Sequence, residues 1–261
     1  MNKLKNLKNI LRGLRRVVVA YSGGLDSTFL LKAAIDTLGK DNVLAVTARS
    51  ETYPLSEYKE ARSTAKRFGA KHLTINTREL DIKSFRSNPV NRCYYCKKEL
   101  FKKLNTIKGK YGMEHVVDGT NLDDLKDIRH GSLAAAEEGV KRPLLEAEIT
   151  KDDIRKFSKD LRLPTWNKPS FACLASRFPF NEKITIAGLK KIEEAEGRMH
   201  RMGFKQVRVR LHGKTARIEV PRNFLSLGLK LKDRIVRELK GIGFIYVALD
   251  LEGYRTGSMH E

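Results

Sequence analysis

Long apolar runs and cysteines are scarce in this chain of 261 residues. No stretch approaches the roughly 18 consecutive apolar residues that a membrane-spanning helix needs. The basic, amphipathic N-terminal segment lacks the unbroken apolar core of a secretory signal, so we expect a cytoplasmic protein. Three cysteines in a reducing compartment argue against structural disulfides.

Acidic residues are also scarce relative to basic ones. The chain has 31 Asp and Glu against 52 Lys and Arg, which gives a formal net charge of +21. This charge indicates an anionic partner, such as a nucleotide, phosphate or RNA, without choosing among them. Hydrophobic residues make up 41% of the chain, which is enough for a core in one large or two small domains.

A glycine-rich loop follows the first predicted strand. Residues 17–20 form a short β-branched run, SGGLDS occupies 22–27, and an apolar helix then leads to another buried strand at 42–50. This order predicts a βαβ unit and a parallel sheet. Backbone N–H groups of such a loop can approach an oxyanion, and the helix dipole favours its charge. The lysine of an ordinary P-loop is missing.

Asp26 is an unexpected charge in an anion-binding loop, because its carboxylate repels phosphate. The repulsion disappears if Asp26 holds a Mg²⁺ ion that bridges the phosphates. The alternative is a helix N-terminus that is capped by serine and aspartate and binds nothing. The complete motif after a buried strand favours a nucleotide site, formed by Ser22, Gly23, Gly24, Asp26 and Ser27.

The motif resembles the PP-loop of the ATP pyrophosphatase (adenine nucleotide α-hydrolase-like) superfamily. That resemblance implies that ATP is cleaved between its α and β phosphates, with AMP transferred to an acceptor and pyrophosphate released. Helices predicted over 58–68 and 101–112 and a strand over 71–76 continue a first, ATP-binding domain over 1–165.

The segment VDGTN ends in polar residues where the carboxyl end of a parallel strand would meet a ligand. Asp118, Gly119 and Thr120 are therefore expected to border the nucleotide. Arg129 is expected either to meet phosphate or to pair with neighbouring aspartates.

The three cysteines, Cys93, Cys96 and Cys173, leave several interpretations open. A thioredoxin-like pair is one, although two tyrosines between its cysteines are unusual. A structural zinc site needs four ligands. A [4Fe–4S] cluster normally takes four thiolates, and with three of them one iron stays open to a non-protein ligand. Three unrelated buried thiols are the remaining alternative.

Motifs over almost the whole chain resemble the LarE family, the pyridinium-3,5-biscarboxylic acid mononucleotide sulfurtransferases that build the nickel-pincer nucleotide cofactor. These motifs are AYSGGLDSTFLLK, VTARSE, CYYCKKELF, VDGTN, TWNKPSFACLASRFPF, GFKQVRVRLH, ARIEVP and YVALDLEGYRTGSM. One type of the family has a sacrificial cysteine, whose position corresponds to Ala172 here. The other type holds a [4Fe–4S] cluster on three cysteines. The resemblance to this second type implies that Cys93, Cys96 and Cys173 ligate the cluster and act in catalysis with Asp26.

From residue 183 the pattern changes to helix, two alternating strands, helix and strand, which predicts a small α+β domain over 183–261. Residues 166–182 form a cysteine-bearing linker. Arg208 and Arg210 share a strand face, where they either bind phosphate or face solvent. The resemblance favours the substrate phosphate, adds acidic positions there, and implies a homo-oligomer. The acidic positions are Glu196 and Glu219.

The resemblance therefore implies an ATP-dependent sulfurtransferase with ATP, Mg²⁺ and a [4Fe–4S] cluster as cofactors. Its substrate would be an anionic pyridinium mononucleotide, whose carboxylate is adenylated and then receives sulfur from iron-bound hydrosulfide. The sulfide donor stays open. The alternative is a tRNA thiolase of the PP-loop class with the same cluster, although this chain lacks the extra zinc-binding cysteine pairs that many thiolases carry. A nucleotide- or RNA-binding protein without catalysis is a further alternative.

Overall fold

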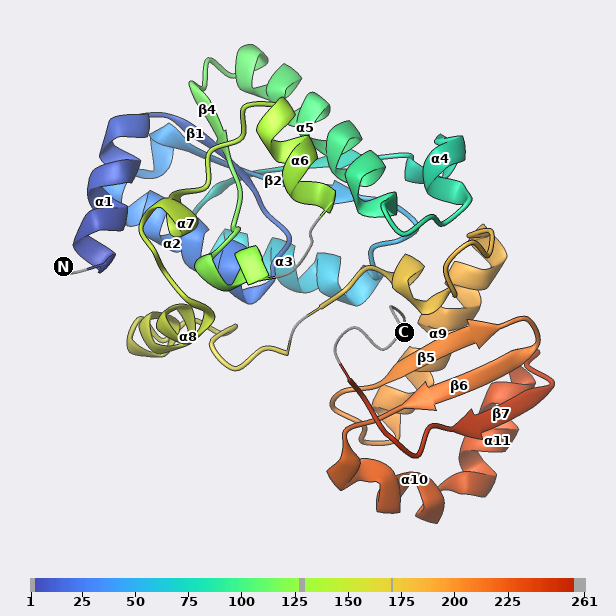
Figure 1. The fold of residues 1–261 in the computed structure, drawn as a ribbon. Helices are drawn as coiled ribbons and strands as arrows, with labels where there is room; N and C mark the ends of the chain where they lie inside the picture. The colour runs from blue at the N-terminus through green and yellow to red at the C-terminus, as the bar shows by residue number, and fades with distance from the viewer. Residues whose placement is uncertain (1–2, 127–129, 170, 256–261) are drawn as a thin grey trace. The chain divides into compact units, whose positions relative to one another are not determined.

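The chain forms two compact units. The computed structural model describes residues 3–126, 130–169 and 171–255. The first unit comprises residues 1–79 and 91–171, and the second comprises residues 80–90 and 172–261 (Figure 1). Segment 80–90 therefore belongs with the C-terminal part of the chain, although its neighbours in sequence belong to the first unit. The boundaries predicted at residues 165 and 182 stay predictions.

A four-stranded parallel sheet forms the centre of the first unit. Its strands are β1 (Val17–Ala20), β2 (Val43–Arg49), β3 (Lys71–Asn76) and β4 (His115–Val117), in the order β3–β2–β1–β4. β1 lies between β2 and β4, so that Val17 pairs with Val43 on one side and with His115 on the other. This sheet confirms the predicted α/β class.

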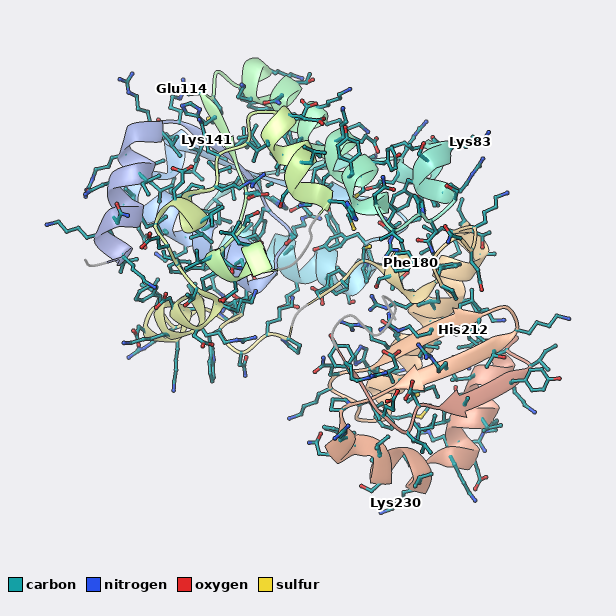
Figure 2. All side chains as sticks on the ribbon, viewed as in Figure 1. Lys83, Glu114, Lys141, Phe180, His212 and Lys230 are labelled. Carbon is teal, nitrogen blue, oxygen red and sulfur yellow. The ribbon has the colours of Figure 1, made fainter. Side chains whose placement is uncertain are left out.

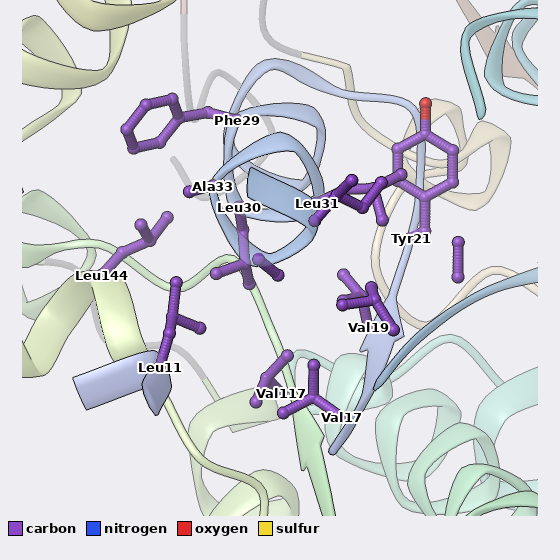
Figure 3. Close-up of a cluster of buried hydrophobic side chains, with 14 of the residues drawn as sticks. Leu11, Val17, Val19, Tyr21, Phe29, Leu30, Leu31, Ala33, Val117 and Leu144 are labelled. Atoms are coloured by element: carbon purple, nitrogen blue, oxygen red, sulfur yellow. The ribbon is translucent and has the colours of Figure 1, made fainter. Parts of the chain in front are cut away.

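Helices cover both faces of this sheet, because β1 sends alternate side chains into two apolar layers. Val17 and Val19 lie in one cluster with Phe29 (Figure 3). Val18 lies in another cluster with Phe101. A strand that is buried on both faces is apolar at every position, as this one is. The helices of this unit are α1 (Lys3–Leu14), α2 (Leu25–Leu38), α3 (Leu55–Arg67), α5 (Arg92–Lys110), α6 (His130–Glu137), α7 (Pro143–Glu146) and α8 (Lys151–Asp160).

The second unit is built around a three-stranded sheet with the order β5–β6–β7. β5 (Arg208–His212) pairs antiparallel with β6 (Thr215–Glu219). The last residue of β5, His212, is labelled in Figure 2. β6 pairs parallel with β7 (Tyr246–Leu249). The core of this unit joins the sheet to its longer helices. Its helices are α4 (Lys83–Arg86), α9 (Ile186–Arg201), α10 (Leu225–Lys230) and α11 (Lys232–Gly241).

Most predicted elements are confirmed, and one differs in a way that matters for the site. The helix predicted over 101–112 begins at Arg92, so the Cys-x-x-Cys pair lies within its first two turns. Two tyrosines between the cysteines obscured the helical pattern, because aromatic residues have modest helix propensity. None of the described helices combines the length and the apolarity that crossing a bilayer requires.

Candidate functional site

The SGGLDS loop lies where the strand order of the first sheet reverses. The chain runs from β1 to β2 and β3 on one side, whereas β4 pairs with the other side of β1. Loops after β1 and β4 therefore meet at a topological switch point, which is where open α/β sheets bind ligands. Gly119, which follows β4, approaches the first turn of α2 so closely that an added Cβ would lie 3.0 Å from the Ser27 nitrogen. The structure thus brings Gly119 beside the loop, with Thr120 next in the chain.

Gly23 allows this loop to lie against helix α3. Its φ is +67°, and a Cβ at this position would lie 2.5 Å from the Ala61 Cβ. Both the backbone conformation and the close contact require glycine. Gly24 is the N-cap of α2, whose first-turn N–H groups have no acceptor within the helix. The loop and helix together form an anion-binding geometry.

The two serines of the motif stabilise the loop itself. The Ser22 and Ser27 hydroxyls are 3.1 Å apart, and the Ser22 N–H donates to the Ser27 Oγ at 3.3 Å. The Ser27 hydroxyl also donates to the Gly24 carbonyl at 3.3 Å. These bonds hold the chain in a tight turn between β1 and α2.

The two carboxylate oxygens of Asp26 differ in their hydrogen bonding. Its Oδ2 accepts a hydrogen bond from the Lys151 ammonium at 2.5 Å. Its Oδ1 is buried and has no hydrogen-bond partner among the described residues. A buried carboxylate oxygen without a donor is costly unless a cation or donor arrives, and Mg²⁺ prefers such oxygen ligands. Asp26 therefore fits the magnesium ion that the nucleotide interpretation requires.

Lys151 is a site residue that the sequence analysis missed. It is the first residue of α8, directly after Thr150, which caps the helix in a capping box with Asp153. Its backbone N–H donates to the Asp123 Oδ2 at 2.8 Å, which places its side chain beside Asp26. The only local signal was a lysine at a helix N-terminus, where a cation opposes the helix dipole and is unfavourable without a nearby anion.

The loop after β4 has its own internal hydrogen bonds. The Asp118 Oδ1 accepts from the Thr120 N–H at 3.1 Å, and the Asn121 Oδ1 accepts from the Asp123 N–H at 3.0 Å. Asp118 thus orders the loop, and its orientation toward a nucleotide stays a prediction. Arg129, which was expected to meet phosphate or the aspartates, lies outside the described residues.

No disulfide joins the three cysteines, two of which belong to the first unit and one to the second. Cys93 is exposed and Cys96 is half-buried, and both lie within the first two turns of α5. The Cys96 thiol lies 3.8 Å from the Glu79 Oε1, and Glu79 is almost fully buried. Cys173, also half-buried, caps a short 3₁₀ turn (Leu174–Arg177) in the second unit. Within the described ranges, no group of three or more His, Cys, Asp or Glu residues is arranged to hold a metal ion.

Arg177 holds the turn after Cys173 and is another residue that the sequence analysis did not select. It is fully buried, and its Nη1 donates to the carbonyl oxygens of Ala172 at 2.6 Å and Cys173 at 3.0 Å. Its Nε and Nη2 donate to the two carboxylate oxygens of Glu196 at 2.9 and 3.0 Å. Glu196 is thus engaged by a guanidinium rather than exposed to solvent.

The other predicted phosphate-binding residues surround this pair in the second unit. Arg210 donates to the Glu219 Oε2 at 2.7 Å and to the Ser176 carbonyl at 2.8 Å. Burial, together with the neighbouring Arg177, lowers the pKa of Arg208 below its ordinary value. Both strand arginines are buried, at 8% and 5% exposure, so the solvent-facing alternative is wrong.

This cluster has more cations than carboxylates. Arg217 donates to the second oxygen of Glu219 at 3.0 Å. Arg217 also pairs with Asp250 at 3.5 Å. Among the described residues, four arginines (Arg177, Arg208, Arg210 and Arg217) thus lie near three carboxylates, and this surplus of positive charge favours an anionic ligand. Such a cluster can bind a phosphate through planar, paired N–H donors.

Comparisons with known proteins show similarity around the nucleotide loop and over almost the whole chain. A family model described as NAD synthase matches residues 4–106. An uncharacterised protein of Synechocystis is 41% identical over 99% of this chain and 97% of its own length. The pyridinium-3,5-bisthiocarboxylic acid mononucleotide synthase of Lactiplantibacillus plantarum is 39% identical over 99% of this chain and 94% of its own length.

A more distant similarity covers only part of the chain. A tRNA-specific 2-thiouridylase of Desulforamulus reducens is 25% identical over 59% of this chain and 53% of its own length. The full-length similarity at 39% identity is decisive, and it confirms the family resemblance drawn from the motifs. The chain belongs to the LarE family, the family of the L. plantarum pyridinium-3,5-bisthiocarboxylic acid mononucleotide synthase.

Proposed function

We propose that this chain is an ATP-dependent sulfurtransferase that converts a carboxylate of a pyridinium mononucleotide into a thiocarboxylate. The observation that carries the proposal is the similarity to the L. plantarum synthase over 99% of this chain. The arrangement of the SGGLDS loop at the switch point supports the nucleotide half of the reaction.

In the first step, the substrate carboxylate attacks the α-phosphorus of ATP, and pyrophosphate leaves. Ser22, Gly23, Gly24 and Ser27 form the turn whose amides receive the phosphates, and Gly119 and Thr120 border it. Asp26, whose Oδ1 has no hydrogen-bond partner among the described residues, would hold the magnesium ion. Adenylation is needed because a carboxylate oxygen is a poor leaving group, whereas AMP leaves readily.

In the second step, sulfide attacks the acyl carbon, and AMP departs with the former carboxylate oxygen. Cys93, Cys96 and Cys173 would be the ligands of a [4Fe–4S] cluster, because such clusters are held by cysteine thiolates and Cys93 and Cys96 lie about one helical turn apart on α5. When bound, that cluster supplies an iron with a free position for a sulfide ligand.

The second unit binds the phosphate of the substrate in this proposal. Arg208 and Arg210 supply the N–H donors, and Glu196 and Glu219 hold the surrounding guanidiniums in place. Both strand arginines are buried, so they need to lose little further water when an anionic partner binds. The predicted homo-oligomer and cytoplasmic location stay predictions.

Anaerobic reconstitution with iron and sulfide, followed by mass analysis of the product, tests the function. The reaction contains ATP, Mg²⁺, sulfide and the pyridinium dicarboxylate mononucleotide. We expect a product in which one oxygen is replaced by sulfur, with AMP and pyrophosphate formed in equal amounts. If pyrophosphate forms without a sulfur-containing product, the proposed adenylation stands and the proposed sulfur transfer is rejected.

A tRNA thiolase is the second candidate, favoured by the partial similarity to the thiouridylase and by the net charge of +21. RNA binding through phosphate contacts weakens steeply as salt rises, because counterions are released on binding. A tRNA affinity that falls steeply with salt, together with thiolated tRNA as product, would favour this candidate over the mononucleotide reaction.

A further inference from the structure

Lys168 connects the nucleotide loop to the chain segment that leads to Cys173. Its ammonium lies 2.8 Å from the carboxylates of Glu57 and Glu60 on α3. It also donates to the carbonyl oxygen of Gly23 at 3.4 Å, and its side chain is only 11% exposed. One largely buried cation therefore links α3 and the SGGLDS loop to the segment around Lys168.

A second connection runs through Tyr53. Its hydroxyl donates to the carbonyl oxygen of Ser22 at 2.7 Å, and its ring meets the Phe171 ring edge-on at a centroid distance of 6.0 Å. Burial raises the pKa of Tyr53 above its ordinary value, so the phenol stays protonated and remains a donor. Two consecutive carbonyls of the nucleotide loop thus accept hydrogen bonds: that of Ser22 from Tyr53, and that of Gly23 from Lys168.

The backbone of the same segment is fastened to α8. The Arg155 guanidinium donates to the carbonyl oxygens of Trp166 at 3.1 Å and of Lys168 at 3.5 Å. The first residue of that helix, Lys151, binds Asp26 in the loop. The segment therefore contacts the nucleotide loop directly and also through a helix whose N-terminus lies at the loop.

The charges make this arrangement sensitive to a bound nucleotide. Glu57 and Glu60 together bring two negative charges close to the loop, and Lys168 balances one of them. Phosphates on the loop amides add negative charge near the same ammonium. Partly buried charges interact strongly, so the phosphates strengthen the hold of the loop on Lys168.

We propose that Lys168 is a positioning residue that couples nucleotide binding on the SGGLDS loop to the ordering of residues 163–169, which precede Cys173 in the sequence. The inference rests on the proposed function, because it assumes that the loop binds ATP. Coupling between two sites is reciprocal. A nucleotide that draws Lys168 to the loop orders the segment, and an ordered segment strengthens nucleotide binding.

Hydrogen–deuterium exchange on the full chain tests the coupling. The probe is the α,β-methylene analogue of ATP with Mg²⁺, and its binding is measured separately by calorimetry. For peptides within 163–169, we expect the analogue to slow exchange roughly fivefold or more, the lower end of typical allosteric coupling. In Lys168→Met we expect this slowing to be lost while the analogue still binds. Lys168→Arg, which keeps the cation, is expected to retain it.

Lys59→Met is the matched control, because Lys59 is an exposed lysine on the same helix as Glu57 and Glu60. This control should bind the analogue and show the same slowing of exchange as the unmodified chain. The proposal is overturned if Lys168→Met keeps the full slowing, or if the unmodified chain binds the analogue without any slowing. Should Lys168→Met not fold or not bind, Lys168→Arg decides, and loss of slowing there overturns the coupling. An unmodified chain that does not bind the analogue would instead overturn the proposed function.

Discussion

Arg177 and Glu196 form a buried two-point ion pair, with Nε to Oε1 at 2.9 Å and Nη2 to Oε2 at 3.0 Å. The same guanidinium binds the carbonyl oxygens of Ala172 and Cys173. One side chain thus determines both the conformation of the turn after Cys173 and its attachment to α9. The position of this cysteine within the second unit depends on a charge pair in the core of that unit.

Breaking this pair should be costly, because the remaining charge is left buried. We expect Glu196→Gln or Arg177→Met to lower the free energy of unfolding by about 3 to 5 kcal/mol. Urea unfolding of the metal-free protein measures this. Arg198→Met on the same helix is the control, because Arg198 pairs with partly exposed Glu194 and Glu238. Its loss should cost no more than about 1 kcal/mol, and equal costs for the two arginines would contradict the special role of Arg177.

Asp26→Asn should abolish the magnesium-dependent exchange of pyrophosphate into ATP. The amide keeps the shape of the side chain but removes the negative charge that would hold Mg²⁺ beside the phosphates. We expect a loss of about 10²-fold or more, as when a preorganised electrostatic group is removed. Asp36→Asn, at a partly exposed position near the end of the same helix, should leave exchange unchanged. Retained exchange in Asp26→Asn would refute the assigned metal role.

Cys96→Ser should remove sulfur transfer and iron binding while preserving adenylation. A serine oxygen is a poor substitute for a thiolate on iron, but the change leaves α5 intact. Iron content, the visible absorption of the reconstituted protein and pyrophosphate exchange provide three independent measurements. Tyr95→Phe, between the cysteines, should retain all three. If pyrophosphate exchange is lost together with iron, Cys96 has a folding role instead.

Gly23→Ala should disturb the nucleotide loop more than its backbone conformation alone explains. The new Cβ would lie 2.5 Å from the Ala61 Cβ. Gly39→Ala is the matched control, because Gly39 has φ +80° but nothing within 4 Å of an added Cβ. In that control, only the backbone strain should lower the free energy of unfolding, by about 1 to 3 kcal/mol. Calorimetric nucleotide affinity and the free energy of unfolding measure the difference.

The double variant Gly23→Ala with Ala61→Gly separates the two causes. Removing the Ala61 methyl group relieves the contact but leaves the positive φ at residue 23. We expect the double variant to recover nucleotide affinity relative to Gly23→Ala alone. If the two changes are simply additive, the contact between the loop and α3 does not explain the effect.

Local features were predictable from the chain. The strand, loop and helix around SGGLDS are contiguous, so β-branched residues, a glycine pair and an apolar helix predict their own arrangement. The same holds for the hairpin of β5 and β6, whose period-two pattern flanks the turn at Gly213. The cysteine-bearing start of α5 was missed, because residues 92–100 carry a weak helical pattern.

The sequence by itself determined the α/β class, the nucleotide loop and the family, because these follow from contiguous motifs and their order. Only the tertiary structure decided which distant side chains meet. Lys151 reaches Asp26 across 125 positions, and Lys168 reaches Glu60 across 108. Periodicity tells which face of a helix is buried, but the partner on that face depends on how the layers pack. A charged side chain therefore reveals its role only when folding places an opposite charge or an unpaired oxygen beside it.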